Sequence, residues 1–149
     1  MLELYEGPLP TEAIYRHWET IARENNFGAV CMFCGIVRDE NGFDGLSFDI
    51  YEPLLKKWFG TWEDLALKKG IIICMAHSIG DVPNAQSSYM SAILSSNRKV
   101  ALELYADFVE DFKHNAPIWK YDLLGSKRIY AKDRSYLLKG AGILKKENQ

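Results

Sequence analysis

Hydrophobic residues recur along the chain with two different periods, which together predict a mixture of helices and strands. Ile14, Trp18 and Ile21 recur at the three- to four-residue spacing of one helix face. Leu46 and Phe48 alternate with polar residues, as in a strand with one buried face. The predicted elements are a helix opening at 10–11 and closed at 26–28, strands at 29–37 and 46–51, a helix from 53 to 70, strands at 71–77 and 89–94 with a loop at 80–86 between them, a helix from 95–96 to about 115, and a strand at 118–124.

This order of elements predicts an α/β (α+β) domain with a mixed sheet. The sequence contains no internal repeat, low-complexity tract or Pro/Ser-rich linker, so we expect a single domain over residues 1–149. Residues 125–149 are basic and weakly patterned, and no element is assigned to them.

Charge and composition narrow the functional classes. The chain has 18 Lys and Arg against 20 Asp and Glu, a formal net charge of −2, which argues against a general nucleic-acid binder but leaves room for a local basic pocket. No apolar run approaches the roughly 18 to 20 residues that span a bilayer, so no membrane association is expected. The first residues lack the pattern of a signal peptide, and we expect a cytoplasmic protein with reduced cysteines.

Four residues have the sequence spacing of a zinc site: Cys31, Cys34, Cys74 and His77. Both pairs lie in apolar, strand-like runs, and residues three apart on a strand point to opposite faces. Packing in the core is therefore the favoured interpretation, and a zinc-stabilised adaptor is the less favoured alternative. His77, at a strand end, is interpreted as a structural histidine.

Arg98 and Lys99 open the third predicted helix, where the partial positive charge of a helix N-terminus disfavours cations. Their presence is explained if an anion such as a phosphate binds there, although two solvated side chains are an equal alternative. Arg38 follows the first long strand and enters a loop, a common place for functional residues.

Lys113 and Lys120 stand on either side of a corner formed by Pro117. Pro117 disfavours helix at the preceding residue, so the chain reverses there and both lysines can converge on one pocket. A lysine that is partly desolvated beside other cations has a lowered pKa, which suits acid/base or nucleophilic chemistry. These lysines, together with Arg38 and Arg98, predict an anion pocket.

The same residues carry a resemblance to a known family. Residues 112–120, Phe-Lys-His-Asn-Ala-Pro-Ile-Trp-Lys, are similar to the family segment Leu-Lys-x-x-x-Pro-Ile-Trp-Lys. Residues 28–38, 48–54, 76–80 and 97–98 resemble further segments in the same order. The family is the large, catalytic subunit of molybdopterin synthase.

The resemblance implies a hammerhead-type fold with an additional antiparallel β subdomain. It implies a homodimer that binds two copies of a small ubiquitin-like sulfur-carrier subunit, forming a heterotetramer. Each carrier threads its Gly-Gly C-terminus, as a thiocarboxylate, into a pocket of the large subunit. Two sulfur transfers to cyclic pyranopterin monophosphate then make molybdopterin, without a metal or prosthetic group.

The resemblance also implies roles for individual residues. Lys113 and Lys120 match the two catalytic lysines, with Lys113 as acid/base or transient nucleophile and Lys120 orienting and neutralising. Arg38 and Arg98 match substrate-binding arginines that hold the phosphate. Further positions that match the substrate pocket are Ile36, Val37, Asn97, Tyr121 and Asp122.

Two departures from the family pattern support an alternative from another functional class. Asn97 stands where the family usually has His, and Ser78 replaces an Arg. An asparagine can donate a hydrogen bond but cannot transfer a proton at neutral pH. The alternative is therefore a non-catalytic homologue that only binds the sulfur-carrier protein, whereas the retained Lys113 and Lys120 favour the enzyme.

Overall fold

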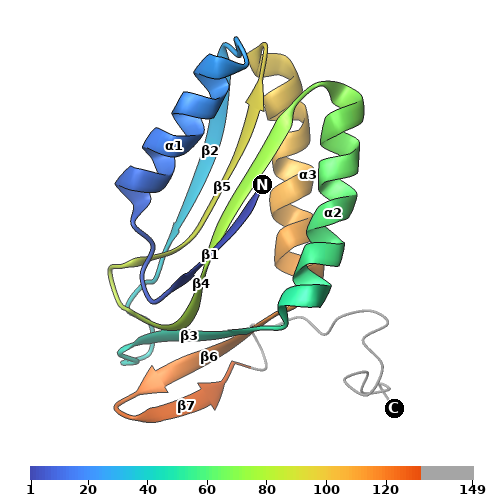
Figure 1. Ribbon diagram of the computed structural model, residues 1–149. Helices are drawn as coiled ribbons and strands as arrows, with labels where there is room; N and C mark the ends of the chain where they lie inside the picture. The colour runs from blue at the N-terminus through green and yellow to red at the C-terminus, as the bar shows by residue number, and fades with distance from the viewer. Residues whose placement is uncertain (132–149) are drawn as a thin grey trace.

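A computed structural model describes residues 1–131, which fold around a sheet of seven strands with three helices (Figure 1). The elements are β1 (Leu2–Glu6), α1 (Thr11–Glu24), β2 (Ala29–Ile36), β3 (Gly45–Ile50), α2 (Glu52–Lys69), β4 (Ile72–Pro83), β5 (Ser87–Ser95), α3 (Arg98–Asn115), β6 (Ile118–Leu124) and β7 (Lys127–Tyr130). The strand order is β2-β5-β4-β3-β6-β7, and β1 pairs with β4. The β1–β4 pair is parallel and the other pairs are antiparallel.

Strand β4 belongs to two parts of the sheet. Its first half pairs with β5, from Ile72 opposite Leu94 onward, and its last residues pair with β3, with Gly80 opposite Phe48. Gly80 has a φ of +76°, which a residue without a Cβ adopts readily, at the point where β4 passes from one part to the other. Strands β3, β6 and β7 then run across the end of the main sheet (Figure 1). This arrangement confirms the expected fold class with its additional antiparallel β subdomain.

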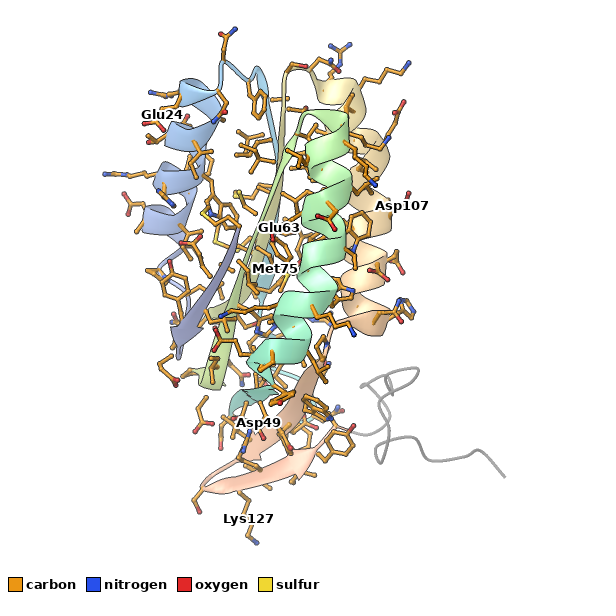
Figure 2. All side chains as sticks on the ribbon, turned by 45° about the vertical axis from the view of Figure 1, so that its right-hand side comes forward. Glu24, Asp49, Glu63, Met75, Asp107 and Lys127 are labelled. Carbon is orange, nitrogen blue, oxygen red and sulfur yellow. The ribbon has the colours of Figure 1, made fainter. Side chains whose placement is uncertain are left out.

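The helices cover both faces of the main sheet, with α1 on one face and α2 and α3 on the other (Figure 1). Because side chains alternate along β4, Cys74 packs in the cluster beneath α1, while Ile73 and Met75 pack beneath α2 and α3. Figure 2 places Met75 between the sheet and α2. Trp18 of α1 is fully buried. The helical spacing read from the sequence therefore identified the buried faces correctly.

The helix ends follow from local residues. Gly70 ends α2 with a φ of +63°, as the sequence predicts, and Lys68 and Lys69 lie in the last turn, where cations are favoured. The third predicted helix, expected to start at 95–96 with Ser95 and Ser96 as caps, begins later, at Arg98. Asn97 is the N-cap, and its side chain accepts hydrogen bonds from the backbone N–H of residues 99 and 100.

The structure differs from the predicted elements in one loop and in two strands that were missed. The predicted loop at 80–86 is strand β4 as far as Pro83, because β3 supplies a distant pairing partner. Strands β1 and β7 were not predicted, since both are short and contain charged residues. Residues 132–149 of the predicted domain lie outside the described residues. None of the helices within residues 1–131 is long and apolar enough to cross a membrane.

Candidate functional site

A cavity of about 240 Å³ lies where the last turn of α3 meets strands β3 to β6. Its lining combines two lysines with apolar and aromatic side chains, and we call it the lysine cavity. The residues that line it are Leu46, Phe48, His77, Ser88, Tyr89, Phe112, Lys113, Ala116, Ile118 and Lys120. Lys113 is exposed and Lys120 is half-buried, so both cations can meet a ligand that enters this cavity from solvent.

A second cavity of about 200 Å³ adjoins the first, and we call it the arginine cavity. Its lining carries both signs of charge: Gly35, Ile36, Val37, Arg38, Glu40, Phe43, Gly45, Leu46, Ser88, Lys120 and Asp122. Leu46, Ser88 and Lys120 line both cavities, so the two spaces share a wall. A ligand in one cavity can therefore reach the neighbourhood of a ligand in the other at Lys120.

The corner between α3 and β6 brings Lys113 and Lys120 together. Helix α3 ends at Asn115, and the backbone N–H of Ile118 donates to the Ala116 carbonyl at 2.8 Å as the chain reverses. Lys120 then pairs with Phe48 in the β3–β6 ladder, which turns it toward the same cavity. The predicted convergence of the two lysines is therefore present in the structure.

Arg38 enters the arginine cavity from the end of β2. The turn between β4 and β5 fixes the backbone just before it: Val37 N–H donates to Gln86 at 2.9 Å, and Val37 accepts from Ala85 at 2.8 Å. The Arg38 guanidinium itself is exposed and forms an ion pair with Glu40. The backbone before Arg38 is thus held by the β4–β5 turn, while its charged end is exposed beside Glu40.

His77 reaches the lysine cavity from β4, a position that its sequence pattern did not predict. Its Nδ1 lies 2.7 Å from the Ser78 carbonyl oxygen. Its ring meets Phe48 edge-on at 4.9 Å and lies 5.8 Å from the ring of Phe112. Burial lowers the pKa of His77 to about 4, so the imidazole is neutral at physiological pH. It is a structural histidine, as expected, but one with a face on the cavity.

The sequence profile of one protein family, described as MoaE protein, matches residues 6–115, which is most of the chain. The chain belongs to the MoaE protein family. The resemblance stated from the sequence is confirmed by this match and by curated relatives named molybdopterin synthase catalytic subunit.

Relatives and solved structures of MoaE proteins cover nearly the whole chain. The molybdopterin synthase catalytic subunit of Helicobacter pylori strain ATCC 700392/26695 is 55% identical over 144 residues, 97% of this chain and 99% of the relative. A structure described as a complex of subunits 1 and 2 of molybdopterin-converting factor from Helicobacter pylori 26695 superposes with a TM-score of 0.92 at 54% identity, covering 97% and 99% of the two chains. The crystal structure of molybdopterin synthase from Staphylococcus aureus gives a TM-score of 0.71 at 25% identity, over 86% and 94%.

This MoaE chain does not bring all the predicted site residues together. Arg98 opens the 18-residue helix α3 and Lys113 lies in its last turn, so about 22 Å of helix axis separates them. Asn97 lies with Arg98 at the far end. Arg98 therefore does not line the cavities of its own chain, whereas Lys120 lines one cavity with Lys113 and the adjoining cavity with Arg38.

The remaining predicted residues do not all line the cavities. Ile36, Val37 and Asp122 line the arginine cavity of the MoaE chain. Tyr121 lines neither cavity, because it alternates with Lys120 and Asp122 along β6 and points to the opposite face. There its ring lies 4.1 Å from the guanidinium carbon of Arg128.

The zinc alternative fails on geometry in this MoaE chain. Cys31 packs against the core beneath α2 and α3, whereas Cys74 packs beneath α1, on the other side of the sheet. Within residues 1–131, no three His, Cys, Asp or Glu side chains are grouped so that they could hold a metal ion. Burial raises the pKa of Cys74 to about 12, which further disfavours the thiolate that metal binding needs.

Proposed function

We propose that this chain is the catalytic subunit of a molybdopterin synthase. It transfers sulfur from the thiocarboxylated C-terminus of a small ubiquitin-like carrier to cyclic pyranopterin monophosphate, within molybdenum cofactor biosynthesis. The observation that carries the proposal is the pair of adjoining cavities, with Lys113 on one, Arg38 on the other and Lys120 on both. Two anionic reactants repel each other, and cations placed between them offset that repulsion.

The two cavities suit different reactants. The lysine cavity has apolar walls and two cations, which fits a narrow Gly-Gly tail that ends in a thiocarboxylate. The arginine cavity offers Arg38 together with the polar side chains of Glu40 and Asp122, which fits a phosphate and a heterocycle with several hydrogen-bonding groups. With the reactants so arranged, the sulfur and the pterin side chain meet beside Lys120.

The lysines then act in distinct roles. Lys120 orients and neutralises the two anions. Lys113 serves as acid/base or as a transient nucleophile at the thiocarboxylate. Each transfer breaks a C–O bond of the pterin side chain and forms a C–S bond in its place, the displaced oxygen leaving as water or with the phosphate; water then cleaves the carrier's C–S bond and leaves a carboxylate on the carrier. The proposal assigns no metal or prosthetic group to the site.

The site is completed by a second copy of the chain. Strand β2 is an edge of the sheet and exposes Met32, Phe33 and Ile36, apolar residues on an open strand edge. Ala29 pairs with Ser95, so the Ala29 end of β2 lies beside the start of α3. Two-fold antiparallel pairing of β2 with its copy sets the Ala29 end of one strand against the Ile36 end of the other.

This pairing brings Arg98 and Asn97 of one copy to the cavities of the other copy, which they do not reach within their own chain. The start of α3 from one copy comes beside Arg38 of the other, and the helix N-terminus adds its partial positive charge to the phosphate site. With one carrier bound to each copy, the assembly is a heterotetramer. The Helicobacter pylori complex of two molybdopterin-converting factor subunits supports the carrier as the partner.

The non-catalytic alternative rested on Asn97, and the structure supplies another reason for that residue. The Asn97 side chain accepts from the N–H of Lys99 at 3.1 Å and of Val100 at 3.5 Å, which is the N-cap role that asparagine fills well. The replacement of histidine therefore needs no loss of activity to explain it.

The test mixes the purified chain with thiocarboxylated carrier and cyclic pyranopterin monophosphate, and measures molybdopterin. Lys113→Ala is expected to abolish product while the carrier remains bound. Lys127→Ala, an exposed lysine at the β6–β7 turn away from both cavities, is the matched control and retains activity (Figure 2). Full activity in Lys113→Ala would overturn the catalytic assignment, and absence of product from the wild-type chain would overturn the function.

A further inference from the structure

His77 presents a hydrogen-bond acceptor to the lysine cavity. Its Nδ1 lies 2.7 Å from the Ser78 carbonyl oxygen, and because a carbonyl only accepts, Nδ1 carries the proton. The neutral ring then has its lone pair on Nε2. Within residues 1–131, no group donates a hydrogen bond to Nε2. His77 is only 3% exposed, yet it lines the cavity, so a cavity ligand is the partner this nitrogen lacks.

The surroundings keep this acceptor neutral and fixed in place. Phe48, Tyr89 and Phe112 surround the imidazole with ring centroids 4.9, 5.9 and 5.8 Å away. The bond from Nδ1 to Ser78 sets the orientation of the ring. A neutral acceptor beside two lysines is able to take an N–H from a ligand whose neighbouring anionic group binds the lysines.

We propose that Nε2 of His77 accepts a hydrogen bond from the last peptide N–H of the carrier tail and so positions the thiocarboxylate at Lys113 and Lys120. This inference rests on the proposed function and adds a positioning residue to it. A peptide that ends in Gly-Gly has an amide N–H directly beside its terminal anion and no side chains to fit. Its chemistry therefore matches a cavity with two cations, a fixed neutral acceptor and largely apolar walls.

A pterin ring fits this cavity less well than the tail does. Its fused heterocycle carries several donors and acceptors, and each one buried without a partner costs free energy. Besides the two lysines, the polar side chains on the lining are His77, Ser88 and the hydroxyl of Tyr89. The arginine cavity, with Arg38, Glu40 and Asp122, offers more partners to such a ring.

A double-mutant cycle on binding tests the proposal without requiring catalysis. The full chain is prepared as wild type, as His77→Phe, which keeps an aromatic ring but removes the acceptor, and as His77→Gln, whose amide oxygen restores one. Each is titrated with carrier ending in its ordinary Gly-Gly carboxylate, and with carrier lacking those two residues. Thermal unfolding of the three chains establishes that each is folded.

We expect truncation of the tail to weaken binding to the wild-type chain. His77→Phe loses about five- to tenfold in affinity for the intact carrier, the size of one hydrogen bond, and nothing for the truncated carrier. His77→Gln recovers most of that loss. A purely structural role for His77 would weaken binding of both carriers alike.

The possible outcomes distinguish failure of the His77 role from failure of the proposed function. If the wild-type chain binds the intact and the truncated carrier with equal affinity, the tail does not bind in the lysine cavity, and the proposed function is overturned as well. A tail effect of equal size in wild type and His77→Phe would overturn only the role of His77. If His77→Phe instead keeps its affinity for the carrier but raises KM for the pterin, then Nε2 binds the pterin and the proposal is wrong.

Discussion

The rings of Tyr89 and Phe112 stack with their centroids 4.0 Å apart and their planes 15° apart. Tyr89 belongs to β5 and Phe112 to the last turn of α3, so the stack fastens the end of the helix to the sheet. Lys113 is the next residue along that turn, and both rings line the lysine cavity. The position of Lys113, the proposed catalytic cation, thus depends on an aromatic contact beside it.

Replacing Phe112 by alanine removes this stack and the contacts of the ring with Trp58 and His77. We expect a loss of about 2–3 kcal/mol in the free energy of unfolding, below the value for a fully buried phenylalanine because Phe112 is half-buried. Phe112→Leu keeps much of the apolar volume and loses about 1 kcal/mol. Urea unfolding at one protein concentration measures both, and an alanine variant as stable as wild type would contradict the role given to the stack.

Asp111 joins the two helices on the same face of the sheet. Its Oδ2 accepts the indole N–H of Trp58 at 2.8 Å and of Trp62 at 2.7 Å. Asp111→Ala leaves both indoles without this acceptor and is expected to cost about 2–4 kcal/mol, while Asp111→Asn keeps an oxygen and costs about half as much. Asp107→Ala, exposed on the same helix, is the control and changes stability by less than about 0.5 kcal/mol (Figure 2). Equal midpoints of thermal unfolding for the Asp111 and Asp107 alanine variants would show that the two indole hydrogen bonds to Asp111 do not stabilise the fold.

The stability of the fold is expected to fall as the pH drops below 6.5 because of His77. Burial lowers its pKa to about 4 in the folded chain, against about 6.5 when unfolded. Between these values the unfolded chain binds a proton that the folded chain does not, so the free energy of unfolding rises with pH across this window. The full difference is about 3 kcal/mol, present above pH 6.5 and lost by pH 4.

Chemical unfolding at several pH values between 4 and 7 measures this slope. His77→Gln removes the group that titrates at this position, so its slope is expected to be smaller by the contribution of that one proton. A variant with the wild-type slope would show that another group causes the pH dependence.

The helices and central strands were predictable from the sequence because their apolar spacing reports directly on a buried face. Ile14 and Trp18 are fully buried where the helical pattern placed them. Strands β1 and β7 were not predictable in the same way, since β1 pairs with a strand far along the chain and β7 pairs with its neighbour β6 without a clear apolar pattern of its own. Leu2 pairs with Met75, and Lys127 with Leu124 across a turn whose residues gave no clear pattern.

Contacts between site residues were likewise predictable only where they depend on nearby sequence. Lys113 and Lys120 could be brought together from sequence because a single corner, forced by Pro117, joins them. The distance from Arg98 to Lys113 follows from helix length alone, yet a family motif does not say which copy of the chain contributes each residue. His77 was missed because its direction depends on the register of β4, which sets it among Phe48 and Tyr89 rather than beneath α1.

Mixing two inactive variants tests whether the site is shared between copies. Arg98→Ala and Lys113→Ala are each expected to be inactive as homodimers. In a mixed dimer, one site joins the intact Lys113 of one copy to the intact Arg98 of the other, whereas the second site lacks both. If the copies exchange freely, half the dimers are mixed and one of their two sites works, so about a quarter of the wild-type molybdopterin yield returns. Sites built within one chain would return nothing on mixing, because every site would then lack one of the two cations.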